Sequence, residues 1–246
     1  TISGNPLGSP DIVGLSTGCA TGALIAIIIL GSSPAVTGVG ALIGGLVSGV
    51  FILACAGGMR VTGMRVVLVG IGCSAALRAV NSLLIVKAPL EAAQRAQLWS
   101  AGSFSGVTFA RLLPLGVLLG VVVFICVAAA VPLGLVAMGD DIATGLGVRV
   151  RRVRVLLIVV AIVLVACATA VAGPIAFVAL SAPHVAHRLC GGVGFASCAV
   201  VGALLVLASD VCAQRLFAPA ELPVGVVTGV LGGLYLLWLL IREVRS

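Results

Sequence analysis

Charge is scarce in this sequence. Of its 246 residues only 9% are charged, whereas 61% are hydrophobic, and the mean hydropathy is +1.35. A soluble domain of this length needs many more charged residues to cover its surface. The composition therefore excludes an ordinary soluble protein and predicts a polytopic membrane protein.

Lysine is nearly absent, because Lys87 is the only one, and the net charge of +7 comes from arginine. The arginines are scattered between apolar runs instead of forming a continuous basic surface. This distribution excludes nucleic acid as a partner, and it is typical of the charge bias of cytoplasmic loops.

Motifs of nucleotide hydrolysis and of metal binding are also lacking. No Gly-x-x-x-x-Gly-Lys-Ser/Thr sequence occurs, so we do not expect the chain to hydrolyse nucleotides. No His-Glu-x-x-His occurs, and none of the eight cysteines forms a Cys-x-x-Cys pair, which favours packing over metal or disulfide roles. We therefore expect no enzyme activity, no metal and no cofactor in this chain.

The apolar runs are long enough to cross a membrane. At about 20 residues per crossing, about eight spans are predicted, over residues 12–30, 35–55, 66–86, 112–131, 153–171, 175–187, 195–217 and 224–241. Residues 87–102 are too polar to cross and predict an amphipathic interfacial helix with Trp99 as its anchor. The fold class is thus an all-α transmembrane helix bundle, a single domain over residues 1–246.

Charge predicts the orientation of this bundle. If the segment before the first span is cytoplasmic, that side holds nine cationic residues, namely Arg60, Arg65, Arg149, Arg151, Arg152, Arg154, Arg188, Arg242 and Arg245. The other side holds Lys87, Arg95, Arg111 and Arg215. The excess indicates that both ends of the chain are cytoplasmic.

One polar stretch, residues 138–148, interrupts the longest apolar region. It contains Asp140 and Asp141 and is followed by an arginine run, Arg149 to Arg154. Hydrocarbon cannot accommodate such a sequence. We therefore expect a loop or short helix on the cytoplasmic face, where a partner protein transmits mechanical energy to this chain.

Few polar residues lie within the spans. Arg78 and Asn81 share a helix face and either line an aqueous pathway or point into the bundle. Asp210 has either a functional role or a pairing role, with Arg215 or a helix terminus as its partner. His184 and His187 favour a helix end that reaches water over a metal or haem pair, because no third ligand lies nearby in the sequence.

Small residues recur at helical spacing in three spans. The stripes are Gly14, Gly18 and Gly22, then Gly40 with Gly44 and Gly45 with Gly49, and last Gly225, Gly229 and Gly233. Such stripes allow helices to approach closely in lipid. They predict a compact bundle and allow a dimer.

Four motifs together resemble one known family. They are Asn5-Pro6-Leu7 with residues 9–18, Gly139-Asp140-Asp141-Ile142-Ala143 through Leu146-Gly147, Gly173-Pro174-Ile175-Ala176-Phe177-Val178 with Pro183-His184, and Pro219-Ala220-Glu221-Leu222-Pro223 through Thr228. In this order they resemble the FecCD-type permeases, the membrane subunits of bacterial ABC importers for iron–siderophores, haem and cobalamin.

The resemblance implies three groups of functional residues. Coupling to an ATPase would involve Gly139, Asp140, Asp141, Ala143, Leu146 and Gly147. The translocation pathway would be lined by Arg78, Asn81, Thr228 and Gly229, and a binding protein would dock at Arg215 and Glu221. The implied partners are a cytoplasmic ATPase dimer that binds ATP, an extracytoplasmic substrate-binding protein, a second permease copy or paralogue, and the lipid bilayer of the bacterial plasma membrane.

Three departures from the family pattern give further expectations. The Asn-Pro-Leu motif follows two helices in the family, so two N-terminal helices are expected to be missing here. The docking arginine of the family falls on Gln214, one residue before Arg215, and the last span contains Gly232-Gly233-Leu234 in place of Gly-Ala-Pro and should be straighter. A truncated remnant that does not transport, and an intramembrane enzyme using Asp210 with the histidines, remain the alternatives to a permease.

Overall fold

The computed structural model describes residues 14–31, 33–57, 63–104, 107–137, 139–190, 194–215 and 222–244. In these ranges the chain forms α-helices and no strand, which confirms the predicted fold class. The helices are α1 (Leu15–Ile28), α2 (Pro34–Cys55), α3 (Gly63–Lys87), α4 (Leu90–Ser100), α5 (Phe109–Ala128), α6 (Ala130–Ala137), α7 (Asp140–Gly145), α8 (Val150–Ala172), α9 (Val178–Cys190), α10 (Phe195–Arg215) and α11 (Val224–Val244).

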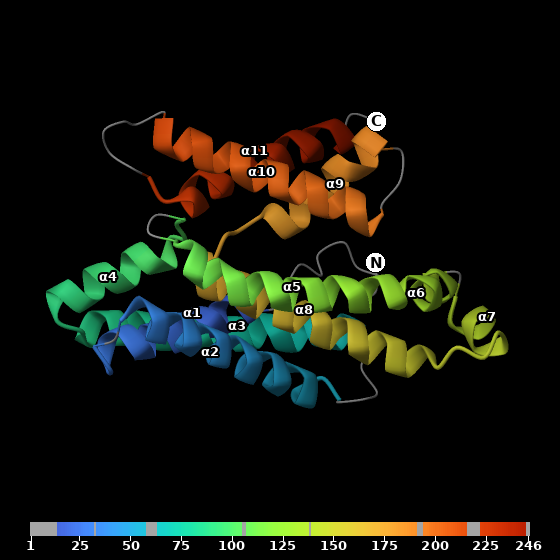
Figure 1. The fold of residues 1–246 in the computed structure, drawn as a ribbon, viewed down its shortest axis with the longest axis horizontal. Helices are drawn as coiled ribbons and strands as arrows, with labels where there is room; N and C mark the ends of the chain where they lie inside the picture. Colours follow the sequence, from blue (N-terminus) through green and yellow to red (C-terminus); the bar gives the residue numbers. More distant parts are fainter. Residues whose placement is uncertain are drawn as a thin grey trace.

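The helices are arranged in two layers (Figure 1). In the first layer α1 contacts α2, α3, α4 and α8, and α5 lies along α8. In the second layer α9, α10 and α11 pack on one another. The helix predicted within residues 87–102 is present as α4, where Ala92 and Ala96 are buried; its place at the membrane interface stays a prediction.

Glycines bring α1 and α2 into close contact. A Cβ atom added at Gly22 would overlap the Gly40 carbonyl oxygen and lie 3.0 Å from the Gly44 Cα. A Cβ at Gly49 would lie 2.6 Å from the Ile162 Cγ2 of α8. The packing predicted for the first two stripes is therefore confirmed. In the last stripe, Gly229 and Gly233 have no described atom within 4 Å of such a Cβ.

The fourth predicted span is bent. Gly116–Ala128 of α5 and Ala130–Val136 of α6 meet at an angle of 50°. Pro132 explains this bend, because proline has no N–H to donate to the Ala128 carbonyl and its ring pushes against that group. The sequence alone predicted one uninterrupted helix here.

Glycines allow the segments after α4 and after α8 to approach the start of α11 closely. Gly102 and Gly173 have positive φ angles of 72° and 73°, which non-glycine residues rarely adopt. The Gly225 N–H donates to the Gly102 carbonyl oxygen (3.3 Å), and a Cβ at Gly225 would overlap the Ala101 carbonyl oxygen. These close approaches join the start of α11 to the end of α4 and the linker after α8.

Fewer helices than predicted have the length of a membrane span. In the described ranges, α2, Met64–Lys87 of α3, α8 and α10 are long and apolar enough, and the bent α5–α6 pair would make five. Leu15–Ile28 and Val224–Tyr235 are shorter apolar helices, and α9 has 13 residues. The predicted number of about eight spans is not confirmed.

Candidate functional site

The polar stretch of the sequence contains α7, a helix of 6 residues. Gly139 precedes it with φ of 123°, a conformation that favours glycine, and Gly147 follows it with φ of 80°. The Val148 N–H donates to the Ala143 carbonyl oxygen (2.9 Å), which closes the end of the helix. Two glycines thus isolate α7 as a separate short helix between α6 and α8.

The exposed surface of α7 is partly apolar. Ile142 in α7 is 51% exposed, and Leu146, which directly follows α7, is 63% exposed; their spacing of four residues places them on the same side. Asp141 beside them is also exposed. Sequence reasoning missed Ile142, although its spacing from Leu146 was visible as a signal.

Ala143, which the resemblance placed among the coupling residues, is buried. It is 0% exposed, so its methyl group packs inward and is not available to a partner. The resemblance included Ala143 because it is part of the motif. Its burial shows that a motif residue can pack inside the fold without contributing to the exposed surface of α7.

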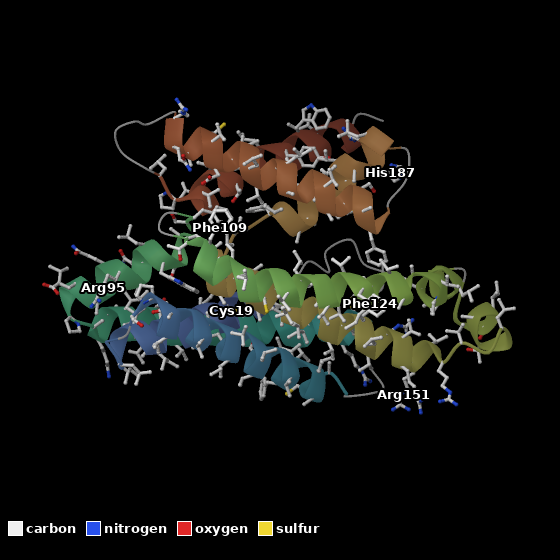
Figure 2. The ribbon with its side chains drawn as sticks, in the orientation of Figure 1. Cys19, Arg95, Phe109, Phe124, Arg151 and His187 are labelled. Carbon is white, nitrogen blue, oxygen red and sulfur yellow. The ribbon has the colours of Figure 1, made fainter. Side chains whose placement is uncertain are left out.

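The arginine run lies in a helix and not in a loop. Arg151, Arg152 and Arg154 belong to the first turns of α8, directly after Arg149. Arg149, Arg151 and Arg152 are exposed, and Figure 2 shows Arg151 pointing away from the bundle. The charge count placed Arg151, Arg152 and Arg154 in a loop, whereas the structure places them in α8.

The structure separates Arg78 from Asn81 on α3. Arg78 is exposed, whereas Asn81 is half-buried and its Oδ1 atom is shielded from solvent with no hydrogen-bond partner in the described part of the chain. Ser82, four residues after Arg78, is exposed as well. The two residues therefore differ in burial, and whether either lines a pathway stays a prediction.

Thr228 and Gly229 lie near the start of α11. Thr228 is only 4% exposed, and its hydroxyl donates to the Gly225 carbonyl oxygen (3.1 Å). Gly229 is half-buried with open space where a side chain would be. The hydroxyl of Thr228 is thus occupied within its own helix.

Asp210 is hydrogen-bonded to Gln214, which occupies the position of the family's docking arginine. The Gln214 Nε2 donates to the Asp210 Oδ2 (2.9 Å), one helical turn away on α10. Arg215, the last residue of α10, is exposed. Glu221 lies outside the described residues, as do the Asn5-Pro6-Leu7 motif and Arg60.

The histidines lie on α9. The His184 Nδ1 is 2.9 Å from the Leu180 carbonyl oxygen, a contact that requires a proton on Nδ1. His187 is exposed in the last turn and is labelled in Figure 2. No group of three or more His, Cys, Asp and Glu side chains that could hold a metal occurs among the residues that the structure describes.

A serine in a Gly-x-Ser-x-Gly pattern also bears on the enzyme alternative. The pattern covers Gly14 to Gly18, and Ser16 is buried in the first turn of α1. A serine nucleophile of this motif must be exposed on a sharp strand-to-helix turn. Ser16 does not have that setting.

The FecCD transport family accounts for this set of features, because its sequence pattern matches residues 1–242. The chain belongs to the FecCD transport family. The matched residues include α7 and both Arg78 and Asn81 of α3. The family is one of transport and not of catalysis, which agrees with the absence of nucleotide-binding and protease motifs noted above.

Curated relatives of this FecCD-family chain are permeases. It is 46% identical to the ferric enterobactin transport system permease protein FepG of Escherichia coli (strain K12), over 98% of this chain and 74% of the relative. It is 37% identical to the "Probable siderophore transport system permease protein YfhA" of Bacillus subtilis (strain 168), over 98% and 74%. It is 32% identical to the hemin permease HmuU of Yersinia pestis, over 97% and 74%.

The fold of this FecCD-family chain also matches a solved structure. A protein described as a metal-chelate type ABC transporter in an inward-facing conformation superposes with a TM-score of 0.87 at 27% identity, over 98% of this chain and 79% of that one. The chain spans about three quarters of the length of its relatives, 74% for FepG. The expectation that two N-terminal helices are missing is not confirmed by these matches.

Proposed function

We propose that this chain is the permease subunit of an ABC importer that passes an iron–siderophore, or a related metal chelate, across the bacterial plasma membrane. The similarity to permeases of ferric enterobactin and other siderophores supports this cargo. The structural observation that carries the transport role is the exposed arginine on α3, Arg78.

Arg78 lies deep within a membrane span. Arg65 and Lys87 bracket the apolar part of α3, about 33 Å apart at 1.5 Å per residue, close to the thickness of a hydrocarbon core. Arg78 is then about 14 Å from the nearer end. A guanidinium at that depth cannot face lipid without a large cost, so it faces water or another protein surface.

The exposed side of α3 near Arg78 suits a pathway. Ser82 and Ala75 lie within one turn of Arg78, and both are exposed, which leaves a small and polar surface. Gly72 has no described atom within 4 Å of an added Cβ. An arginine in such a setting attracts an anionic chelate, because charges interact more strongly where water is scarce.

Energy for transport comes from a partner in this proposal. A cytoplasmic ATPase dimer binds ATP. It contacts α7 through Ile142, Leu146 and the acidic Asp141. Movement of α7 then reorients the bundle between its two access states. Gly139 and Gly147 isolate α7 so that it moves as a unit, and Asp140 adds negative charge to the same contact.

The remaining partners follow from the orientation. With α7 in the cytoplasm, both ends of the chain are cytoplasmic and the whole of residues 1–246 forms one transmembrane domain. A substrate-binding protein docks on the opposite face near Arg215 and Glu221. A second permease copy or paralogue faces the first across the pathway, with Asn81, Thr228 and Gly229 near it.

Replacing Arg78 tests the transport role. In proteoliposomes with the ATPase and saturating binding protein, Arg78→Leu should lower the initial rate of ferric-chelate uptake on the order of tenfold, because the pathway loses its cation. Arg78→Lys should retain much of the rate. Association with the ATPase, measured by co-purification, should not change.

A matched control is available on α4. Arg95 is also exposed but belongs to a helix outside the membrane span, so Arg95→Leu should leave uptake within about twofold of wild type. Uptake by Arg78→Leu at the wild-type rate, with the protein folded and bound to its ATPase, would contradict the pathway assignment.

A further inference from the structure

We propose that the connection between α8 and α9, residues 173–177, transmits movement of α7 to α11, with Phe177 as its positioning residue. We call residues 173–177 the transmission segment. The inference rests on the proposed function, because it requires that α7 contacts the ATPase and that α11 borders the pathway.

The transmission segment continues the helix that follows α7. That helix, α8, contacts α7 and has 23 residues, so it extends about 34 Å. It ends at Ala172, and Gly173 with its φ of 73° turns the chain away from the helix axis. Figure 1 shows this connection passing from the first layer to the second. A single long helix therefore joins α7 to the transmission segment.

The transmission segment lies along α11. A Cβ added at Gly225 would lie 3.2 Å from the Pro174 carbonyl oxygen, and a Cβ added at Gly232 would overlap the Phe177 Cβ and lie 2.8 Å from its Cγ. The two glycines are about 10.5 Å apart along the helix, and a nearly extended chain covers about 10 Å from Pro174 to Phe177. The segment thus runs beside α11 from one glycine to the other.

The backbone of Phe177 is strained. Its φ of 66° is the only positive value at a non-glycine residue in the described ranges. The Val178 N–H donates to the Ala176 carbonyl oxygen (2.9 Å), which makes Phe177 the central residue of a γ-turn, and the form with positive φ is rare and strained. Such a conformation persists only where neighbouring contacts hold it, and here Gly232 supplies the contact.

Phe177 also begins α9. Its carbonyl oxygen accepts hydrogen bonds from the Leu180 N–H (3.1 Å) and from the N–H and hydroxyl of Ser181 (both 2.9 Å), while its side chain packs on α11. A shift of α8 relative to α11 separates the ring from Gly232 and allows Phe177 to leave the left-handed region. The segment then has two arrangements, which correspond to the two access states of the transporter.

Thermal melting of the purified full chain tests the strained contact without any transport. Phe177→Ala removes the ring and retains the strain, whereas Phe177→Gly removes both. We expect Phe177→Gly to melt about 2–4 °C above Phe177→Ala, which is the reverse of the usual order in helices. A midpoint of Phe177→Gly below that of Phe177→Ala would overturn the proposal.

Chelate uptake per ATP hydrolysed tests the transmission role. In proteoliposomes with the ATPase and saturating binding protein, Gly232→Ala should lower this ratio about fivefold or more, because the added methyl group displaces Phe177. ATPase co-purification and ATP hydrolysis should persist. Phe177→Gly should lower the ratio similarly, and Gly232→Ala/Phe177→Gly should be no worse than Phe177→Gly, because the overlap is gone.

Gly233→Ala is the matched control. It adds the same methyl group at the next residue, where no described atom lies within 4 Å, and it should keep the ratio within about twofold of wild type. Phe177→Gly adds no atom and provides the readout if Gly232→Ala does not fold.

The outcomes separate this inference from the proposed function. Wild-type uptake with an unchanged ratio in both Gly232→Ala and Phe177→Gly would overturn the transmission role alone. Uptake and ATP hydrolysis that fall together in these variants would also overturn it, because that result indicates a purely structural contact. A wild-type complex that takes up no chelate would instead overturn the proposed function.

Discussion

Replacing Ile142 and Leu146 together by aspartate should abolish energised uptake. Both side chains are more than half exposed on one face of α7, and burial of such a side chain against a partner contributes about 1.5–3 kcal/mol. Because about half of each side chain is already covered within the chain, the double change removes about 1.5–3 kcal/mol of contact, which corresponds to an ATPase affinity lowered by more than about tenfold. Co-purification of the tagged ATPase and chelate uptake in proteoliposomes measure the two effects.

The same substitution at the other end of the bundle is the control. Leu98 of α4 is 65% exposed, so Leu98→Asp also removes an exposed apolar side chain, but it should leave ATPase association intact. Asp141→Lys, a charge reversal beside the apolar pair, should have a smaller effect than the double change. ATPase binding that survives Ile142→Asp/Leu146→Asp would exclude α7 as the coupling surface.

Substituting Gly22 by valine should lower the stability of the whole bundle. The Cβ of valine would overlap the Gly40 carbonyl oxygen of α2, and backbone atoms cannot move aside as a flexible side chain can. Overpacking of this kind costs about 1–3 kcal/mol, so the thermal midpoint in detergent should fall by about 5–10 °C. A fluorescence-based thermal melt measures this shift.

Gly72 provides the comparison for this second change. It lies in α3 with no described atom within 4 Å of an added Cβ, so Gly72→Val introduces the same side chain into a helix without an overlap. We expect its midpoint to stay within about 2 °C of wild type. Equal shifts for the two variants would mean that the loss comes from helix propensity and not from the α1–α2 contact.

Much of the fold could be predicted from residue type alone. Long apolar runs can satisfy their backbone in lipid only as helices, so α2, α3, α8, α10 and α11 fall within a few residues of the predicted spans. The amphipathic α4 was visible for the same reason, because its polar residues could not cross. Glycines four residues apart in the first two spans predicted the close α1–α2 contact.

The candidate site was predicted less completely. The motif identified the α7 stretch, but its residues are contiguous in sequence and only their burial shows that Ile142 is exposed and Ala143 is not. Asn81 and Arg78 are only three residues apart, yet a difference of about 60° around the helix leaves one half-buried and the other exposed. The helices α1, α2 and α4 pack against α3, and such packing covers only part of its circumference.

The sequence by itself determined that this chain is a helical membrane protein, that its acidic stretch lies outside the lipid, and that it belongs with the permeases, because hydropathy and short motifs are local properties. The tertiary arrangement decided which side chain of α3 is exposed and which residues of α7 a partner can touch. Those properties depend on which faces meet across helices far apart in the chain, and no local pattern specifies them.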